Sequence, residues 1–133
     1  MEKISVKTHK QCELLDITPQ VESLVRESEV ASGICCVFVP HTTAGVTINE
    51  NADPNVIRDI IMELNKIVPL DDNYTHGEGN SAAHIKSSMM GCSQEILIEK
   101  GRLALGTWQS LFFCEFDGPR SRMAWVRVMG DKE

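Results

Sequence analysis

The sequence predicts an α+β fold: a mostly antiparallel β-sandwich with two or three helices in one compact domain. Several short segments alternate polar and apolar residues, as strands with one buried face do. Helical spacing of apolar residues occurs between these segments without the regular alternation of strand and helix that a parallel sheet requires. The 133 residues, 42% of them hydrophobic, are enough for one core, and no internal repeat or linker interrupts them. We therefore expect residues 1–133 to form a single domain.

The first third of the chain predicts a strand, a helix and a second strand. Residues 4–9 alternate in polarity. Thr18-Pro19 has the form of a helix N-cap followed by proline at the first helical position, and apolar residues in 21–25 follow at helical spacing. Gly33 is expected to end this helix. The continuous apolar run 34–39 then predicts a strand that is buried on both faces.

The middle of the chain predicts a strand followed by two helices. Residues 46–50 alternate in polarity. Asp53-Pro54 is the clearest helix start, because aspartate caps free amides and proline gives up an N–H that would have no partner. An apolar stripe over 56–68 makes this helix amphipathic, and we expect the stripe to lie in the core. A polar segment, 71–80, precedes a short helix over 81–90.

The last third predicts mainly sheet. Strands are expected at 96–98, 108–116 and 123–128, where apolar and β-branched or aromatic residues gather. Residues 117–120, Asp-Gly-Pro-Arg, predict a hairpin turn that joins the last two of these strands.

Composition and net charge limit the binding partners and the cellular compartment that we expect. The net charge of -6 disfavours nucleic acid, and no basic patch offsets it. No apolar stretch is long enough for a spanning helix, and the amino terminus lacks the apolar run of a secretory signal, so we expect no membrane partner. Five cysteines without a C-x-x-C pair fit a reducing compartment. The expected location is cytoplasmic.

Three histidines, His41, His76 and His84, lie outside the regular core in polar or glycine-containing segments. Imidazole is the commonest metal ligand in proteins, so these residues are candidates for a divalent cation, zinc or magnesium. Their spacing matches no compact zinc signature, and ordinary hydrogen-bonded histidines are the alternative.

The segment 76–81, His-Gly-Glu-Gly-Asn-Ser, is a candidate anion site. Two glycines permit unusual backbone angles, and the helix that follows offers unpaired N–H groups to a phosphate. Lys86 would add charge one helical turn further on, and the hydroxyls of Thr42 and Thr43 would donate from the other loop. The alternative is a plain connecting loop.

Three carboxylates, those of Glu50, Asp53 and Glu78, belong to the same segments. Carboxylates hold hard cations or move protons, so these residues are candidates for catalysis. Asp53 has a second interpretation as the cap of its helix, and Glu50 and Glu78 can also be simply solvated.

Three blocks of the sequence resemble the YjbQ-like family, whose members are called secondary thiamine-phosphate synthases. The blocks are His41-Thr42-Thr43-Ala44 with Ile48-Asn49-Glu50 and Asp53-Pro54; His76-Gly77-Glu78-Gly79-Asn80 with Ala83-His84; and Leu105-Gly106-Thr107-Trp108-Gln109. The resemblance extends from the first strand to Val128.

The resemblance implies an α+β sandwich that forms a homotrimer, with clefts between subunits that contain the histidines. It marks the three histidines as metal or substrate ligands, with Glu50, Asp53, Asn80, Trp108 and Gln109 nearby. Of these, Asn80, Trp108 and Gln109 are the expected substrate-binding residues, and Trp108 can stack on a ring or belong to the core. The implied reaction couples a pyrimidine methyl diphosphate to a thiazole phosphate and releases pyrophosphate, as a main or a side activity.

Two other functions use the same residues. One is a metal-dependent hydrolase, in which Glu50 or Glu78 acts as base toward a bound water. The other is a non-catalytic oligomeric binder of a small phosphorylated ligand. The products formed and the effect of removing metal distinguish the three.

Overall fold

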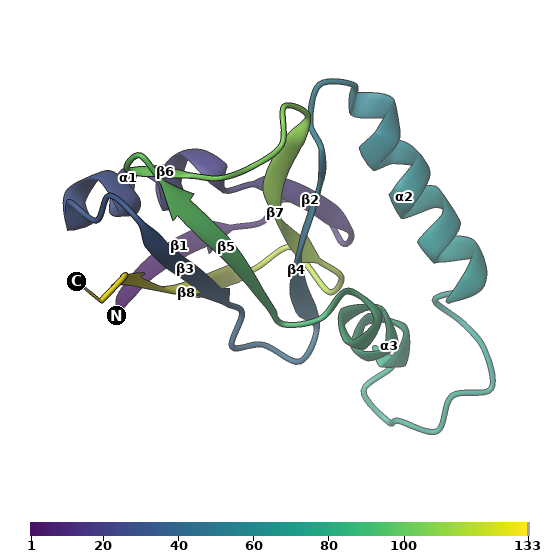
Figure 1. Cartoon of the computed structure of the whole chain (residues 1–133). Coiled ribbons are helices and arrows are strands. Elements are labelled where there is room, and N and C mark those ends of the chain that lie inside the picture. Colours follow the sequence, from purple (N-terminus) through teal and green to yellow (C-terminus); the bar gives the residue numbers. More distant parts are fainter. Residues whose placement is uncertain (133) are drawn as a thin grey trace.

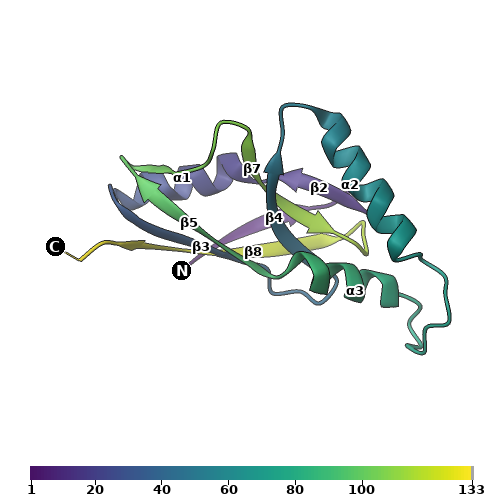
Figure 2. The same cartoon turned by 45° about the vertical axis from the view of Figure 1, so that its right-hand side comes forward.

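A computed structural model describes residues 1–132, which form eight strands and three helices (Figures 1 and 2). The strands are β1 (Glu2–Lys7), β2 (Glu13–Asp16), β3 (Gly33–Phe38), β4 (Ala44–Glu50), β5 (Ser93–Glu99), β6 (Arg102–Leu103), β7 (Gln109–Glu115) and β8 (Ser121–Gly130). The helices are α1 (Thr18–Ser28), α2 (Pro54–Ile67) and α3 (Ser81–Met90). The predicted α+β class is confirmed.

The strands make two sheets. The larger has the order β1-β8-β3-β5-β6 and the smaller the order β2-β7-β4. Every strand pair in residues 1–132 is antiparallel, as expected. The two sheets enclose the main core with α1, while α2 and α3 lie on the other side of the smaller sheet (Figure 2). The smaller sheet is therefore the middle of three layers.

Strand β7 lies at the centre of this arrangement. Its side chains alternate between two cores: Leu111 and Phe113 belong to the core between the sheets, and Phe112 and Cys114 to the core under α2 and α3. All four are almost fully buried. This double burial explains the nearly continuous apolar sequence of β7.

Strand β3 does not have the predicted burial on both faces. Cys35 and Val37 are fully buried, but Ile34 is 37% and Phe38 is 38% exposed. The larger sheet has only one covered face, so alternate residues of β3 point outward. An apolar run that short does not reveal how many layers cover a strand, and this prediction was wrong.

The predicted hairpin at 117–120 was also wrong. Strand β7 belongs to the smaller sheet and β8 to the larger, so the turn carries the chain from one sheet to the other. Turn residues fix the local reversal of the backbone, but they do not select the strand with which the next segment pairs.

The predicted helices are present, with shifted ends. Helix α1 begins at Thr18, whose N–H donates to Asp16 Oδ1 over 2.9 Å, and it ends at Glu29 in the left-handed conformation (φ 59°) rather than at Gly33. Helix α2 begins after Asp53, whose Oδ1 accepts from Asn55 N over 2.9 Å, so its predicted capping role is confirmed. None of the helices described in residues 1–132 has the length and hydropathy needed to cross a bilayer.

The apolar stripe of α2 is less buried than expected. Leu64 packs in the second core, and Ile57, Ile60 and Ile61 lie partly buried against it. Ile67, at the end of the helix, is 57% exposed. Helix α2 therefore stands partly away from the smaller sheet, as Figure 1 shows.

Candidate functional site

A polar hollow of about 440 Å³ contains all three candidate histidines. We call it the histidine pocket. Three chain segments meet there: the connection from β3 to β4, the loop into α3, and the turn from β7 into β8. Its lining consists of Pro40, His41, Thr42, Thr43, His76, Glu78, Asn80, His84, Asp117, Arg120 and Arg122.

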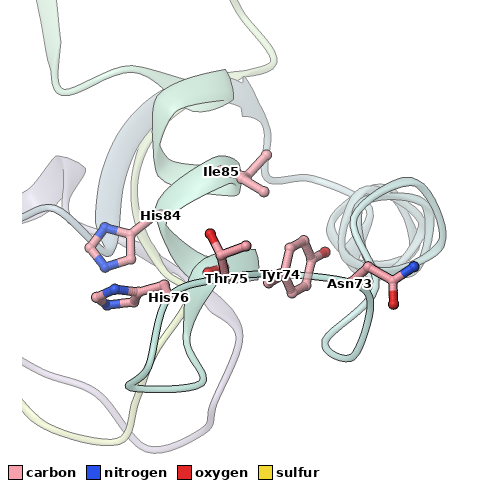
Figure 3. A pocket seen from close by; sticks show the side chains of 7 residues that line it. Asn73, Tyr74, Thr75, His76, His84 and Ile85 are labelled. Atoms are coloured by element: carbon pink, nitrogen blue, oxygen red, sulfur yellow. The ribbon is translucent and has the colours of Figure 1, made fainter.

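His76 and His84 lie side by side because the backbone turns between them. Gly79 has φ +75°, and its N–H donates to the carbonyl of His76 over 3.4 Å. Asn80 is the N-cap of α3, and its carbonyl accepts from the N–H of His84 over 3.3 Å. The two imidazole rings are perpendicular, with centroids 5.3 Å apart (Figure 3). The glycine-rich segment thus serves to aim two imidazoles at one place.

The same two histidines border a second, mostly apolar hollow of about 460 Å³, which Figure 3 shows. Tyr74 and Ile85 line it, and the Tyr74 hydroxyl donates to the carbonyl of Pro69 over 2.6 Å. This bond fixes the loop that precedes His76. The two imidazoles therefore lie between a polar and an apolar hollow, an arrangement suited to a ligand that has both a polar and an apolar part.

His41 is held in a defined tautomer. Its Nε2 accepts from the N–H of Met123 over 3.0 Å, so the proton of the neutral ring is on Nδ1. Burial and the nearby charge of Arg122 lower the pKa of His41, which keeps the ring neutral at pH 7. With Nε2 occupied and Nδ1 protonated, His41 in this conformation is a hydrogen-bond donor to the pocket and not a ready metal ligand.

Arg122, which lines the pocket, belongs to a buried ion pair. Arg122 donates from Nε to Glu115 Oε1 over 2.9 Å and from Nη2 to Glu115 Oε2 over 2.6 Å. Arg122 is 5% exposed and Glu115 is fully buried. Arg122 Nη2 also donates to Thr43 Oγ1 over 2.8 Å, and Thr8 Oγ1 donates to Glu115 Oε1 over 2.8 Å. The predicted hydroxyl of Thr43 is therefore held by Arg122.

Sequence reasoning missed this ion pair, although a signal was present. Arg122 has the same strand parity as the buried residues Ala124 and Val126, and Glu115 lies inside the apolar run of β7. A charge at an inward position of a strand is costly unless it is paired, so each residue predicts a partner. The sequence does not show that the two pair with each other.

Asn80 lines the pocket, and its side-chain amide is held in place. Its Nδ2 donates to Asp117 Oδ2 over 2.9 Å, and Asp117 also accepts from Arg120 Nη2 over 3.0 Å. The Asp117 carboxylate thus fixes which way the Asn80 amide points. Asn80 Oδ1 is buried and has no hydrogen-bond partner within residues 1–132.

The donors for a cation are two imidazoles and one nearby carboxylate. His76 Nε2 lies 3.9 Å from Glu78 Oε2, and His84 is adjacent to His76. Imidazole nitrogen suits zinc better than magnesium, which prefers oxygen ligands. Across the described residues no three His, Cys, Asp or Glu side chains converge closely enough to hold a metal ion. The described residues therefore do not form a metal site by themselves.

Four other predicted residues lie at the opposite end of β4. Glu50 ends that strand and is paired in register with Gln109, whose Oε1 accepts from the N–H of Gly106 over 2.8 Å. Asp53 caps α2, and Trp108 is 64% exposed and so is not a core residue. The seven residues of β4 span roughly 20 Å, so these side chains and the histidine pocket of the same chain are apart.

Lys86 does not lie in the histidine pocket, and its predicted contribution there was wrong. Successive residues of a helix are 100° apart, so Lys86 points to nearly the opposite side of α3 from His84. Its ammonium donates to Asn65 Oδ1 on α2. A side chain half a helical turn away points to the other side of the helix, so Lys86 cannot contribute to the site of His84. The prediction did not take this into account.

Comparison with known proteins places the chain among close relatives. Residues 2–131 match the protein family described as UPF0047 protein YjbQ-like. The chain is similar to a UPF0047 protein of Methanocaldococcus jannaschii, with 58% identity over 98% of this chain and 94% of the relative. It is also similar to the UPF0047 protein YugU of Bacillus subtilis, with 47% identity over 98% of this chain and 99% of YugU.

Solved structures have the same fold. An uncharacterized conserved protein of the YjbQ/UPF0047 family from Clostridium acetobutylicum has 53% identity and a TM-score of 0.96, covering 97% of this chain and 100% of that protein. The conserved hypothetical protein TT1486 from Thermus thermophilus has 41% identity and a TM-score of 0.90, covering 97% and 100%.

Proposed function

Because the chain belongs to the UPF0047 YjbQ-like family, we propose that it is an enzyme that binds a small phosphorylated substrate in the histidine pocket. The reaction proposed is that of a thiamine-phosphate-synthase-like transferase, which couples a pyrimidine methyl diphosphate to a thiazole phosphate. The observation that carries the proposal is the convergence of three imidazoles and two guanidinium groups on one hollow. Groups of this kind bind phosphate oxygens.

In this reaction the carbon–oxygen bond to the diphosphate breaks, and pyrophosphate leaves with the bonding electrons. The thiazole nitrogen then bonds to the methylene carbon. Negative charge develops on the leaving oxygen, and the half-exposed guanidinium of Arg120, with the Nδ1–H of His41, would stabilise it. Asn80, which lines the pocket, would contact the pyrimidine. The attacking nitrogen needs no base, so positioning of the substrates and neutralisation of the developing charge are sufficient for this reaction.

A divalent cation is part of the proposal, with His76 and His84 as its ligands from this chain and Glu78 beside them. When bound, the cation supplies further positive charge next to the departing pyrophosphate. The position of Glu78 in the pocket also leaves the hydrolase alternative open, since its carboxylate can act as a base if water replaces the thiazole.

We also propose that the chain forms a homotrimer, in which a neighbouring copy completes the pocket. Large apolar side chains are exposed on the outer face of the larger sheet, among them Leu97 (60%) and Met129 (49%), and Trp108 is exposed at the far end of β4. Exposed apolar surface of this kind is typical of subunit interfaces.

The oligomer is tested by sedimentation equilibrium. We expect the mass of three chains, and we expect Leu97→Lys to shift the population toward smaller species because a charge in a subunit interface is costly. A wild-type protein that sediments at 14.8 kDa would contradict the homotrimer.

The transferase activity is tested with both precursors and a matched pair of histidine variants. We expect the wild type to form thiamine phosphate and His84→Ala to be slower by about 100-fold, because a pocket imidazole is lost. His9→Ala is the control, since His9 is an exposed residue outside the pocket whose Nδ1 lies near Glu13. Zinc content, measured by elemental analysis, should fall in His84→Ala and not in His9→Ala.

The alternatives give different results in the same assay. Pyrophosphate or phosphate release without coupling would indicate a hydrolase. Binding of the precursors without turnover, unchanged by a chelator, would indicate a non-catalytic binder. Equal rates for His84→Ala and His9→Ala would show that the histidine pocket takes part in neither the transferase nor the hydrolase reaction.

A further inference from the structure

A second polar hollow, separate from the histidine pocket, lies between α2, α3 and the segment before β2. Its volume is about 320 Å³. Lys86 of α3, Asn65 of α2, and Gln11 and Cys12 from the segment before β2 provide its polar lining. Figure 1 shows the two helices that border it. Three elements far apart in the sequence thus bring polar side chains to one place that the proposed transferase reaction does not use.

The charge of Lys86 is buried, and no carboxylate of the described residues 1–132 is paired with it. Lys86 is 3% exposed, and its Nζ donates to Asn65 Oδ1 and lies 3.9 Å from Cys12 Sγ. The ion pairs formed by residues 1–132 do not include Lys86. A buried ammonium ion that has only neutral partners is costly, so this arrangement needs a counter-charge.

Neighbouring groups do not supply that charge. Burial, with smaller contributions from Glu115 and Asp117, raises the pKa of the Cys12 thiol although Lys86 acts to lower it, so the thiol stays neutral at pH 7. The carboxylates of Glu115 and Asp117, which also act on Cys12, are paired with Arg122 and Arg120. Among residues 1–132, no acidic side chain lines the hollow.

The rest of the lining indicates the kind of anion. Ile61, Leu70 and Phe116 provide apolar walls, and Leu70 is 50% exposed at the rim. Asn65 Oδ1 is used by Lys86, which leaves the Nδ2 of Asn65 as a donor. Two or more donors beside a hydrocarbon surface match a ligand with one charged end and one apolar end.

We propose that this hollow binds a small carboxylate with a short aliphatic chain. Its oxygens accept from Lys86 Nζ and Asn65 Nδ2, and its chain packs against Ile61, Leu70 and Phe116. The carboxylate neutralises the buried ammonium, and the apolar walls select against inorganic anions.

Butyrate is the probe, compared at constant ionic strength with butyramide, which has the same size and no charge. We expect butyrate at tens of millimolar to raise the Tm of the wild type by about 3 °C and to shift the Asn65 side-chain amide resonances, and butyramide to do neither. In Lys86→Met the Kd for butyrate should rise by about tenfold or more, because a charge-assisted hydrogen bond is lost.

Two variants locate the effect. Lys66→Met removes an exposed lysine of α2 (69% side-chain exposure) and should bind butyrate like the wild type. Arg120→Gln removes a guanidinium of the histidine pocket and should also leave butyrate binding unchanged. Loss of binding in Arg120→Gln but not in Lys86→Met would assign the anion to the histidine pocket and overturn the proposal.

The ligand-free proteins provide a second measurement. If Lys86 serves only the fold, Lys86→Met should lower the Tm; if it serves a ligand, removal of the uncompensated charge should leave the Tm unchanged or raise it. A lower Tm for Lys86→Met, or a larger stabilisation of the wild type by phosphate than by butyrate, would contradict the proposed site.

Discussion

Replacing Glu115 by glutamine is expected to lower the free energy of unfolding by about 3–5 kcal/mol. The side chain keeps its shape, but Arg122 loses the charge that accepts both of its hydrogen bonds. Because Glu115 is fully buried and Arg122 is 5% exposed, water cannot replace the lost partner. Urea unfolding, followed by circular dichroism, measures the change.

Two further variants test whether the loss of stability in Glu115→Gln comes from the broken ion pair. Glu115→Leu combined with Arg122→Met removes both charges and should recover most of the stability, since a buried pair can be replaced by apolar side chains. Glu63→Gln breaks an exposed contact with Lys66 and should cost less than about 0.5 kcal/mol. A double variant no more stable than Glu115→Gln would show that the pair is not the cause.

The same pair predicts how stability depends on pH. Burial alone would raise the pKa of Glu115, but hydrogen bonds from Arg122, the Asp117 N–H and Thr8 outweigh it and hold the pKa below its ordinary value of 4.5. A lowered folded-state pKa stabilises the protein above pH 4.5, and this stabilisation is lost as the pH falls through the folded-state pKa. The difference between wild type and Glu115→Gln should therefore shrink in acid; a constant difference would contradict the pKa direction.

Replacing Gly33 by alanine is expected to lower the free energy of unfolding by about 3 kcal/mol or more. An added Cβ would lie 1.9 Å from the carbonyl oxygen of Met129 and 2.9 Å from the Cα of Gly130. Both contacts are with backbone atoms of β8, so no side chain can rotate to relieve them. Strands β3 and β8 would have to separate where Gly33 pairs with Gly130. Urea unfolding again provides the measurement.

Gly77→Ala is the matched control for this prediction. A Cβ at Gly77 would have no heavy atom within 4 Å, and its φ lies outside the left-handed range. We expect its effect to stay within about 0.5 kcal/mol. If the two alanine variants were equally stable, close approach of the backbones would not be the reason for glycine at position 33.

The helices were predicted well because the sequence signals for a helix are local. Helix α3 covers Ser81–Met90, the range predicted from the sequence, and α2 begins at Pro54 after its aspartate cap. Caps, proline positions and apolar spacing act within a few residues, so one segment contains all the information that such a prediction needs. Helix α1 ends at Glu29, which has a left-handed backbone conformation. A glutamate in the sequence does not predict this conformation, so the end of α1 was predicted at the wrong residue.

The residues of the candidate site were predicted only in part. Polar loops and glycine turns marked His41, His76 and His84, and all three line one pocket. Arg120 and Arg122 were not marked, because their position depends on a chain that crosses between the two sheets and not on a hairpin. Lys86 was assigned to the wrong face of its helix.

The sequence by itself determined the class of the fold, the sites of its helices and the family to which the chain belongs. The tertiary structure alone decided that Glu115 meets Arg122, that Glu50 and Trp108 lie a strand's length from the histidines, and that Lys86 lines a hollow of its own. The physical reason is that periodicity and capping depend on neighbours along the chain, whereas the surroundings of a side chain depend on which distant segments pack against it.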